Sequence, residues 1–413
     1  NHMPHHFFDI GIITLLAALA AIFLSRLQQL PMIGYVIAGV IIGPALLGII
    51  SDEKEIAFVA EIGVILLLFI LGMELPLESF KKSYKIAVPV TFALIGLSLA
   101  MVFAIGFIVE MSVAQKIVYG FIISLSSTAV AVKLLANVGL LTKGTGQIAV
   151  SVLIAQDLLF VPMIMLTNAL GSEAGIDLAF IPKMLIATAL LIGLILYLSR
   201  KEKVQLMFEN TVEKHDDLIP VAALAWCFVG AGLSEYAGLS PAFGAFLAGL
   251  VIGNSYSKEM VMPKIEPMQH VLLMVFFLSI GMLIDFGVIA DNLLLISGLL
   301  VATMLFKTIA CITLLKLFLP QDRWRCSFVT GLTIGQIGEF SFIIAAAALA
   351  NGIFDDESYK VIIAVIALSL ALSPLWMAIL HRFVQISYVD KTAHALKSAL
   401  LLCFSRTRVV NSR

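Results

Sequence analysis

The strongest constraint on this chain of 413 residues is a series of apolar stretches, each suited to cross a lipid bilayer. A spanning helix needs about 20 mostly apolar residues. The chain has thirteen such stretches: residues 5–26, 31–49, 56–75, 86–109, 117–137, 146–169, 178–199, 217–236, 240–254, 267–285, 293–318, 326–350 and 359–381. Hydrophobic residues make up 61% of the chain, above the roughly half of a soluble domain. We therefore predict an all-α polytopic membrane protein with thirteen transmembrane helices.

Charge and cysteine usage exclude several classes of function. Lysine and arginine number 26 against 27 acidic residues, so the chain lacks the basic footprint of a nucleic-acid-binding protein. The four cysteines have no paired spacing, which argues against a disulfide framework and a zinc site. No Ser/His or paired-Asp constellation occurs at matched depth, so we expect a non-enzymatic protein without a cofactor.

The loops between the apolar stretches carry their positive charge on one side. Of the 26 lysines and arginines, 21 fall on one face of the predicted bundle. Because cationic loops stay in the cytoplasm, this face is the inner one. The pattern predicts a multi-pass protein of the inner (plasma) membrane, with the N-terminus outside and the C-terminus in the cytoplasm.

An internal repeat relates the two halves of the chain. The run from Gly34 to Gly43 (GYVIAGVIIG) matches the run from Gly244 to Gly253 (GAFLAGLVIG), 210 residues later. Three more matches have offsets of 209 to 212 residues: Gly72 with Gly281, Gly120 with Gly331, and Asp157 and Pro162 with Ser369 and Pro374. Because an odd number of spans separates the equivalent helices, the two repeats must be inverted, as in many secondary transporters.

This repeat predicts the domain boundaries. The first six-helix repeat covers residues 1–175, and a linker helix with a cytoplasmic loop follows at 176–215. The inverted second repeat covers 216–385, and 386–413 form a basic cytoplasmic tail.

Three ionisable residues are predicted near the middle of the bilayer, where each needs a functional reason. Asp157 lies ten residues after Gln147, or about 15 Å into a hydrocarbon core about 30 Å thick. Lys307 and Glu339 have similar depth, so the three can meet. A carboxylate at Asp157 can hold a proton or a monovalent cation, and this competition suffices for exchange. The alternative is an Asp157 that only pairs with Lys307.

Two spans contain central sequences that disfavour a continuous helix. Ser124–Thr128 is rich in hydroxyl residues, and Thr333–Glu339 contains two glycines. Irregular backbone at membrane depth must line a cavity or be buried in protein, so we expect both helices to break there. Glu339 would then suit the positive half-helix ends and Lys307 the negative ones.

Other polar residues have two readings. Two roles are open for Ser126, Ser127 and Thr128. Their oxygens complete a shell around the cation, or their hydroxyl groups only hold neighbouring helices together. Glu61 lines an outer funnel or extends toward the membrane surface, and Glu74 is expected to sit at the interface.

Five motifs in order resemble the second monovalent cation:proton antiporter family, most closely its Kef-type potassium:proton branch. The resemblance covers about residues 7–385 and lies in AEIGV with GMEL (from Ala60 and Gly72), LSSTA (from Leu125), Gln156-Asp157, FFLSIGM (from Phe276) and GQIGEF (from Gly335). It implies an NhaA/NapA-like antiporter fold with crossed discontinuous helices. It also implies a homodimer formed by a panel of the first three helices of each repeat, beside a mobile core of the last three.

The resemblance also implies residue roles. Asp157 is the carboxylate shared by cation and proton, and Lys307 is the core lysine. Electrogenic sodium-selective relatives carry two adjacent acids, whereas Gln156 here suggests one cation for one proton. Kef proteins continue into a nucleotide-binding domain with a Gly-rich fingerprint. That fingerprint is not found in this sequence, so we expect either a truncated sequence or an ungated member, with any regulatory domain or subunit absent from this chain.

We therefore expect an electroneutral antiporter that exchanges K⁺ for H⁺ by alternating access. The alternatives are a Na⁺/H⁺ antiporter of the same family and a gated, channel-like K⁺ efflux pathway. The only bound species expected are K⁺ or Na⁺ and H⁺.

Overall fold

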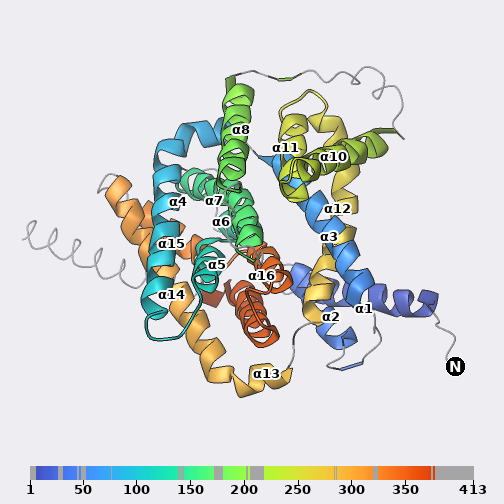
Figure 1. The fold of residues 1–413 in the computed structure, drawn as a ribbon, viewed down its shortest axis with the longest axis vertical. Coiled ribbons are helices and arrows are strands. Elements are labelled where there is room, and N and C mark those ends of the chain that lie inside the picture. The colour runs from blue at the N-terminus through green and yellow to red at the C-terminus, as the bar shows by residue number, and fades with distance from the viewer. Residues whose placement is uncertain are drawn as a thin grey trace, which may run out of the picture. The chain divides into compact units, whose positions relative to one another are not determined.

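The computed structural model describes residues 6–26, 31–43, 46–47, 53–75, 77–137, 140, 144–171, 180–200, 203–204, 218–282, 284, 286–319, 324–373 and 375–376. The elements named within them are helices (Figure 1): α1 (His6–Arg26), α2 (Pro31–Ile42), α3 (Glu53–Glu74), α4 (Leu77–Ile105), α5 (Val113–Ser124), α6 (Thr128–Asn137), α7 (Gly144–Leu170), α8 (Phe180–Arg200), α10 (Leu218–Tyr236), α11 (Pro241–Gly253), α12 (Lys258–Met282), α13 (Phe286–Asp291), α14 (Leu293–Phe318), α15 (Trp324–Ile334) and α16 (Phe340–Ala350). Residues 356–373 are also helical.

These helices confirm a polytopic all-α membrane fold. Within the described residues, six segments are long and apolar enough to cross a bilayer, and α2, α11 and α16 are shorter apolar helices. Both predicted helix breaks are present, because α5 gives way to α6 at 125–127 and α15 gives way to α16 at 335–339.

Some predicted boundaries were wrong for local reasons. α2 ends at Ile42 and not at residue 49, because Pro44 disfavours helical geometry in the residue before it. α12 begins nine residues before the predicted 267, at Lys258. Its first turns carry charged residues, which apolar content alone does not identify as part of a spanning helix. The predicted tail, 386–413, lies outside the described residues.

The helices pack in two groups. α1, α2, α3, α10, α11 and α12 contact one another and are the helices that the resemblance assigns to the panel, so we call them the panel group. α4, α5, α6, α7, α14, α15 and α16 also contact one another, and we call them the core group. α8 packs on α4 and α7, and after it Val204 forms an isolated parallel bridge with Ser255, at the end of α11.

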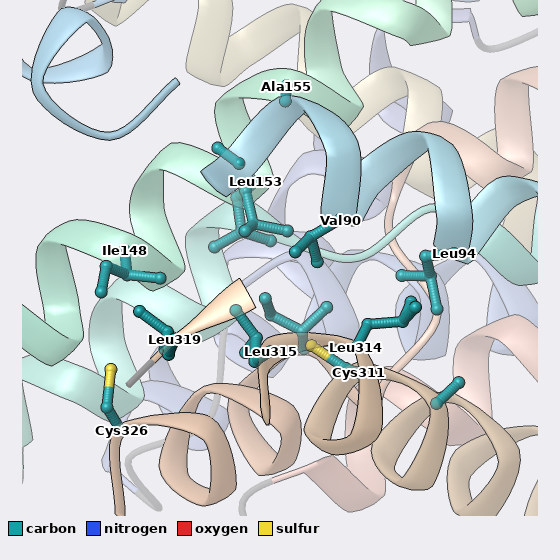
Figure 2. Packing of buried hydrophobic residues seen from close by; sticks show 14 of the residues in the cluster. Val90, Leu94, Ile148, Leu153, Ala155, Cys311, Leu314, Leu315, Leu319 and Cys326 are labelled. Atoms are coloured by element: carbon teal, nitrogen blue, oxygen red, sulfur yellow. The ribbon is translucent and has the colours of Figure 1, made fainter. Parts of the chain in front are cut away.

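The core group is held by an apolar cluster between α4, α7, α14 and α15 (Figure 2). Val90 and Leu94 of α4 meet Leu153 of α7 and Leu314 and Leu315 of α14 within it. Burial of a Leu or Val side chain contributes about 1.5–3 kcal/mol where water is the alternative. Where lipid is the alternative, the hydrophobic effect contributes little and close packing of the side chains stabilises the contact instead. The fit of these side chains therefore positions α7 against α14.

Glycines set the closest approaches in the panel group. A Cβ at Gly39 of α2 would overlap the backbone of α12 at Leu278 and Gly281. A Cβ at Gly249 of α11 would likewise overlap the backbone of α3 at Phe69. Small residues let transmembrane helices approach closely, so these positions fix the spacing of the panel helices.

The packing predicts opposite outcomes for two glycine-to-alanine changes. Gly249→Ala should lower stability by about 1–3 kcal/mol, because the added methyl group has no room. Gly96→Ala, where a Cβ meets nothing within 4 Å, should be neutral or slightly stabilising because alanine favours helix. Thermal unfolding of the two purified variants in detergent measures the difference, and equal midpoints would contradict the close-packing argument.

Candidate functional site

The two helix breaks of the core group lie directly against each other. The Gly338 N–H donates to the Leu125 carbonyl at 3.1 Å, and the Ser126 hydroxyl donates to the Ile334 carbonyl at 2.8 Å. The Gln336 amide donates to the Ser127 carbonyl at 3.2 Å. Each break thus supplies hydrogen-bond partners to the other, which satisfies backbone groups that a membrane would otherwise leave unpaired.

Glycine is required at the closest point of this contact. A Cβ at Gly338 would lie 2.6 Å from the carbonyl carbon of Ser126, and no side chain tolerates that distance. The glycine therefore allows the break at 335–339 to contact the break at 125–127.

Lys307 of α14 lies at the carboxyl ends of two half-helices. Its side chain is 0% exposed, and its ammonium group donates to the carbonyl oxygens of Leu125 and Gln336, the latter at 2.7 Å. Leu125 is the C-cap of α5, and Gln336 follows the end of α15. Helix carboxyl ends carry partial negative charge, so the ammonium group meets two of them at once.

Glu339 lies at the amino ends of α16 and α6, where the partial charge of the helices is positive. It is the N-cap residue of α16, and its carboxylate accepts hydrogen bonds from the Ser127 hydroxyl and from the N–H of Ala129, in the first turn of α6. Helix amino ends carry partial positive charge, which favours a carboxylate there. Its Oε2 atom is buried and has no partner among the described residues.

Asp157 lies in the middle of α7 and is 2% exposed. Its Oδ2 atom accepts a hydrogen bond from the Thr128 hydroxyl at 2.8 Å, whereas its Oδ1 atom has no partner in the described part of the chain. Both amide atoms of the adjacent Gln156 are also buried without a described partner. A buried polar atom without a partner costs about 1–3 kcal/mol, so each of these atoms is suited to bind a water, and the oxygens are also suited to bind a cation. The Asp157 carboxylate can take up a proton instead.

Among the described residues no carboxylate lies within ion-pair distance of Lys307; the ion pairs of Lys203 with Glu259 and of His270 with Glu266 lie elsewhere. The alternative in which Asp157 only pairs with Lys307 is therefore wrong. The ammonium group is held by carbonyl groups, which leaves the Asp157 carboxylate available.

The remaining sequence-predicted residues have distinct places. The Ser126 hydroxyl is engaged by Ile334 and therefore binds the two breaks together. Thr128 bonds directly to Asp157. Ser127 links the start of α6 to Glu339. The side chain of Glu61, in α3, lies outside the described residues.

Two further residues, which were not among the predicted site residues, support the site. The Ser369 hydroxyl accepts a hydrogen bond from the Ile337 N–H at 2.9 Å, within the second break. Gln336 bonds to the first break through its amide and to Lys307 through its carbonyl. The internal repeat contained the signal for Ser369, since that residue is the repeat counterpart of Asp157.

The donor set of the site is one carboxylate with neutral oxygens. Within the described ranges there is no group of three or more His, Cys, Asp or Glu side chains that could hold a metal ion. A single negative charge with hydroxyl and amide oxygens balances one proton or one monovalent cation.

Comparison with known proteins finds a matching family and two similar transport proteins. The family described as sodium/hydrogen exchanger, transmembrane, matches residues 12–382. The iron transporter MagA of Paramagnetospirillum magneticum is 36% identical over 379 residues, which cover 92% of this chain and 86% of that protein. The K(+) efflux antiporter 5 of Arabidopsis thaliana is 28% identical over 89% of this chain and 65% of its own length.

A solved structure also has the same fold. The structure of the sodium proton antiporter MjNhaP1 from Methanocaldococcus jannaschii at pH 8 matches with a TM-score of 0.69 and 17% identity. The match covers 91% of this chain and 98% of that one.

The geometry at Lys307 predicts a large effect on stability. Lys307→Met keeps the apolar length of the side chain but removes its donors. The Gln336 carbonyl then loses this hydrogen bond at about 1–3 kcal/mol, whereas the Leu125 carbonyl keeps its bond from the Gly338 N–H. The matched control is Lys316→Met on the same helix, where the side chain is exposed. Thermal unfolding in detergent should show a large drop for the first variant only, and a similar drop in both would contradict the structural role.

Proposed function

We propose, because the chain belongs to the sodium/hydrogen exchanger family, that it is an electroneutral antiporter that exchanges one monovalent cation, K⁺ in preference, for one proton. Membership in this family makes it a multi-pass membrane transporter and not an enzyme. The observation that carries the proposal is the buried Asp157 carboxylate, with one oxygen bonded to Thr128 and the other without a partner.

In this mechanism the cation and the proton compete for Asp157. A protonated carboxyl group has lost the charge that attracts a cation, and a bound cation disfavours protonation, so each species displaces the other. Gln156 is proposed as a second ligand, because its amide is buried and unpartnered beside Asp157. Thr128 holds the carboxylate in place, while Ser126 and Ser127 hold the break that borders the cation site.

Lys307 and Glu339 are proposed to compensate the charge of the broken helices. Lys307 neutralises the carboxyl ends of α5 and α15, and Glu339 neutralises the amino ends of α6 and α16. With the half-helix ends neutralised, the charge that changes during the cycle is that of Asp157. Glu61 is proposed to line the outer funnel.

Transport requires movement, because Asp157 is 2% exposed. We assign the panel and core groups to the fixed and moving parts of an alternating-access cycle. The glycine contacts support an inverted repeat over 1–175 and 216–385 within a thirteen-span topology, since Gly39 meets Gly281 while their repeat counterparts, Gly249 and Gly72, also meet.

Assembly, location and regulation are proposed as follows. The panel helices form a homodimer in the inner (plasma) membrane, with the N-terminus outside and the basic tail of 386–413 in the cytoplasm. We propose that the exchange requires no resident cofactor. The likeness to the K(+) efflux antiporter of Arabidopsis supports K⁺ as the transported cation and membership in the Kef-type branch.

Other transported ions and a channel-like pathway are alternatives, and each predicts a different experimental result. Sodium would use the same site, since Na⁺ and K⁺ carry equal charge. MagA, a relative 36% identical, is an iron transporter, but a single carboxylate would leave a bound divalent ion with excess positive charge. A channel-like pathway would give currents that follow the membrane potential.

Asp157→Asn should abolish cation-driven proton movement in proteoliposomes that report internal pH, because the neutral amide can neither take up a proton nor balance a cation. The control, Asp291→Asn, removes an exposed carboxylate at the end of α13 and should keep wild-type rates. Exchange that persists in Asp157→Asn would exclude this residue as the carrier.

Competition predicts a specific pH dependence. The apparent cation affinity should fall as pH falls, because protons then occupy Asp157 more of the time. Rates with K⁺, Na⁺, Rb⁺, Li⁺ and Fe²⁺ as drivers, measured across pH and at zero or imposed membrane potential, test this. An affinity independent of pH would contradict competition, voltage-dependent rates would contradict electroneutrality, and a preference for Fe²⁺ would contradict the monovalent assignment.

A further inference from the structure

Two pairs of phenylalanine rings lie beyond Asp157, toward the end of α7, and the proposed exchange uses none of them. Phe160 follows Asp157 by three residues, so it lies on the same side of α7 and about 4.5 Å further along the helix axis. Its ring meets that of Phe340, the first residue of α16, with the centroids 4.9 Å apart. Both rings are buried. Aromatic side chains therefore close the interface of α7 and α16 beside the site.

α16 runs alongside α7 and is fixed against the core group. At its end, the Asn351 side chain donates to the Asn168 side chain near the end of α7 at 3.1 Å. Near its start, the Ser341 hydroxyl donates to the Ile122 carbonyl of α5 at 3.0 Å. Consecutive side chains of a helix point about 100° apart, so the next residue, Phe342, faces a third neighbour.

That third neighbour is the panel group. The ring of Phe342 meets the ring of Phe277 of α12 edge to face, with the centroids 6.0 Å apart and the planes at 82°. Phe342 is 0% exposed and Phe277 is 2% exposed. Phe277 belongs to the motif FFLSIGM, and Phe342 follows the motif GQIGEF by two residues. The contact has no hydrogen bond to break, so it can seal a boundary along which two groups of helices move.

The opposite side of the site is more polar. The first turn of α15 lies near the start of α7, since Cys326 and Ile148 belong to the same cluster (Figure 2). The Ser327 and Thr330 hydroxyls of α15 are buried and have no partner in the described part of the chain. Water usually satisfies buried polar groups that lack a protein partner. Water is therefore favoured on this side of Asp157 and disfavoured on the aromatic side.

We propose that the contact of Phe277 with Phe342 is a gate. It keeps water and ions from reaching Asp157 along the boundary of the panel and core groups on the aromatic side, while the carboxylate exchanges its ligand on the other side. This inference rests on the proposed function, since alternating access at Asp157 requires such a barrier. Both rings act by excluding water and are positioning residues.

The test separates leak from exchange. In proteoliposomes, Phe277→Ala and Phe342→Ala should each raise the voltage-driven flux of K⁺ or H⁺ roughly two- to tenfold, the change in open population that loss of one aromatic pair supports. The double variant should leak no more than either single variant, because both single changes remove the same contact. Phe342→Leu, which keeps an apolar side chain at the boundary, should leak less than Phe342→Ala and more than the wild type.

The matched control is Phe354→Ala. Phe354 is 3% exposed and stacks on Tyr119 of α5 with the centroids 4.6 Å apart, so its loss removes a comparable aromatic contact that does not involve α12. A raised flux in the two gate variants and not in the control supports the gate. Equal leaks in all three, or no leak in either gate variant, would overturn it. If thermal unfolding shows that the alanine variants do not fold, Phe342→Leu against Phe354→Leu makes the same comparison with a smaller loss of packing.

The conditions of the flux measurement separate the gate from the antiport proposal. K⁺ and pH are equal on both sides, and a gradient of a permeant anion imposes the membrane potential, so no exchange is driven. A leak in the gate variants supports the gate even if the wild type performs no cation–proton exchange, a result that would refute antiport alone. Normal exchange in the wild type without a leak in the gate variants would refute the gate alone.

Discussion

The site depends on the hydrogen bonds of one buried ammonium group to two broken helices. Lys307 binds the Leu125 and Gln336 carbonyls, which belong to breaks more than two hundred residues apart in the chain. Without the ammonium group, two helix carboxyl ends would meet in a low-dielectric interior with no positive charge between them. The first of these breaks leads into α6, whose first residue, Thr128, bonds to Asp157.

Three levels of chemistry combine at Asp157. The apolar cluster of α4, α7, α14 and α15 positions α7, and the Thr128 hydroxyl orients the carboxylate. The Asp157 Oδ1 and Gln156 Oε1 atoms then supply buried acceptors without a partner in the described part of the chain. Packing, orientation and unsatisfied polarity together give a carboxylate that gains from binding a small cation or a proton, and this is the physical basis of the proposed exchange.

The panel glycines that the proposed repeat pairs with each other also make matching contacts. Gly39 meets Gly281, and the counterparts Gly249 and Gly72 meet in the same way. The repeat offset of 209 to 212 residues also relates Leu125 to Gln336, so Lys307 binds two carbonyls at equivalent positions of the proposed repeats. A single side chain placed between two equivalent breaks can therefore satisfy both.

The sequence by itself determined the all-α membrane fold, both helix breaks and the choice of Asp157, Lys307 and Glu339, because apolar length and the cost of intramembrane charge are local properties. Only the tertiary structure decided their partners. Lys307 binds carbonyls and not Asp157, and Ser369 supports the second break. Such contacts join residues far apart in the chain, and their distances arise from helix packing, which no local pattern encodes.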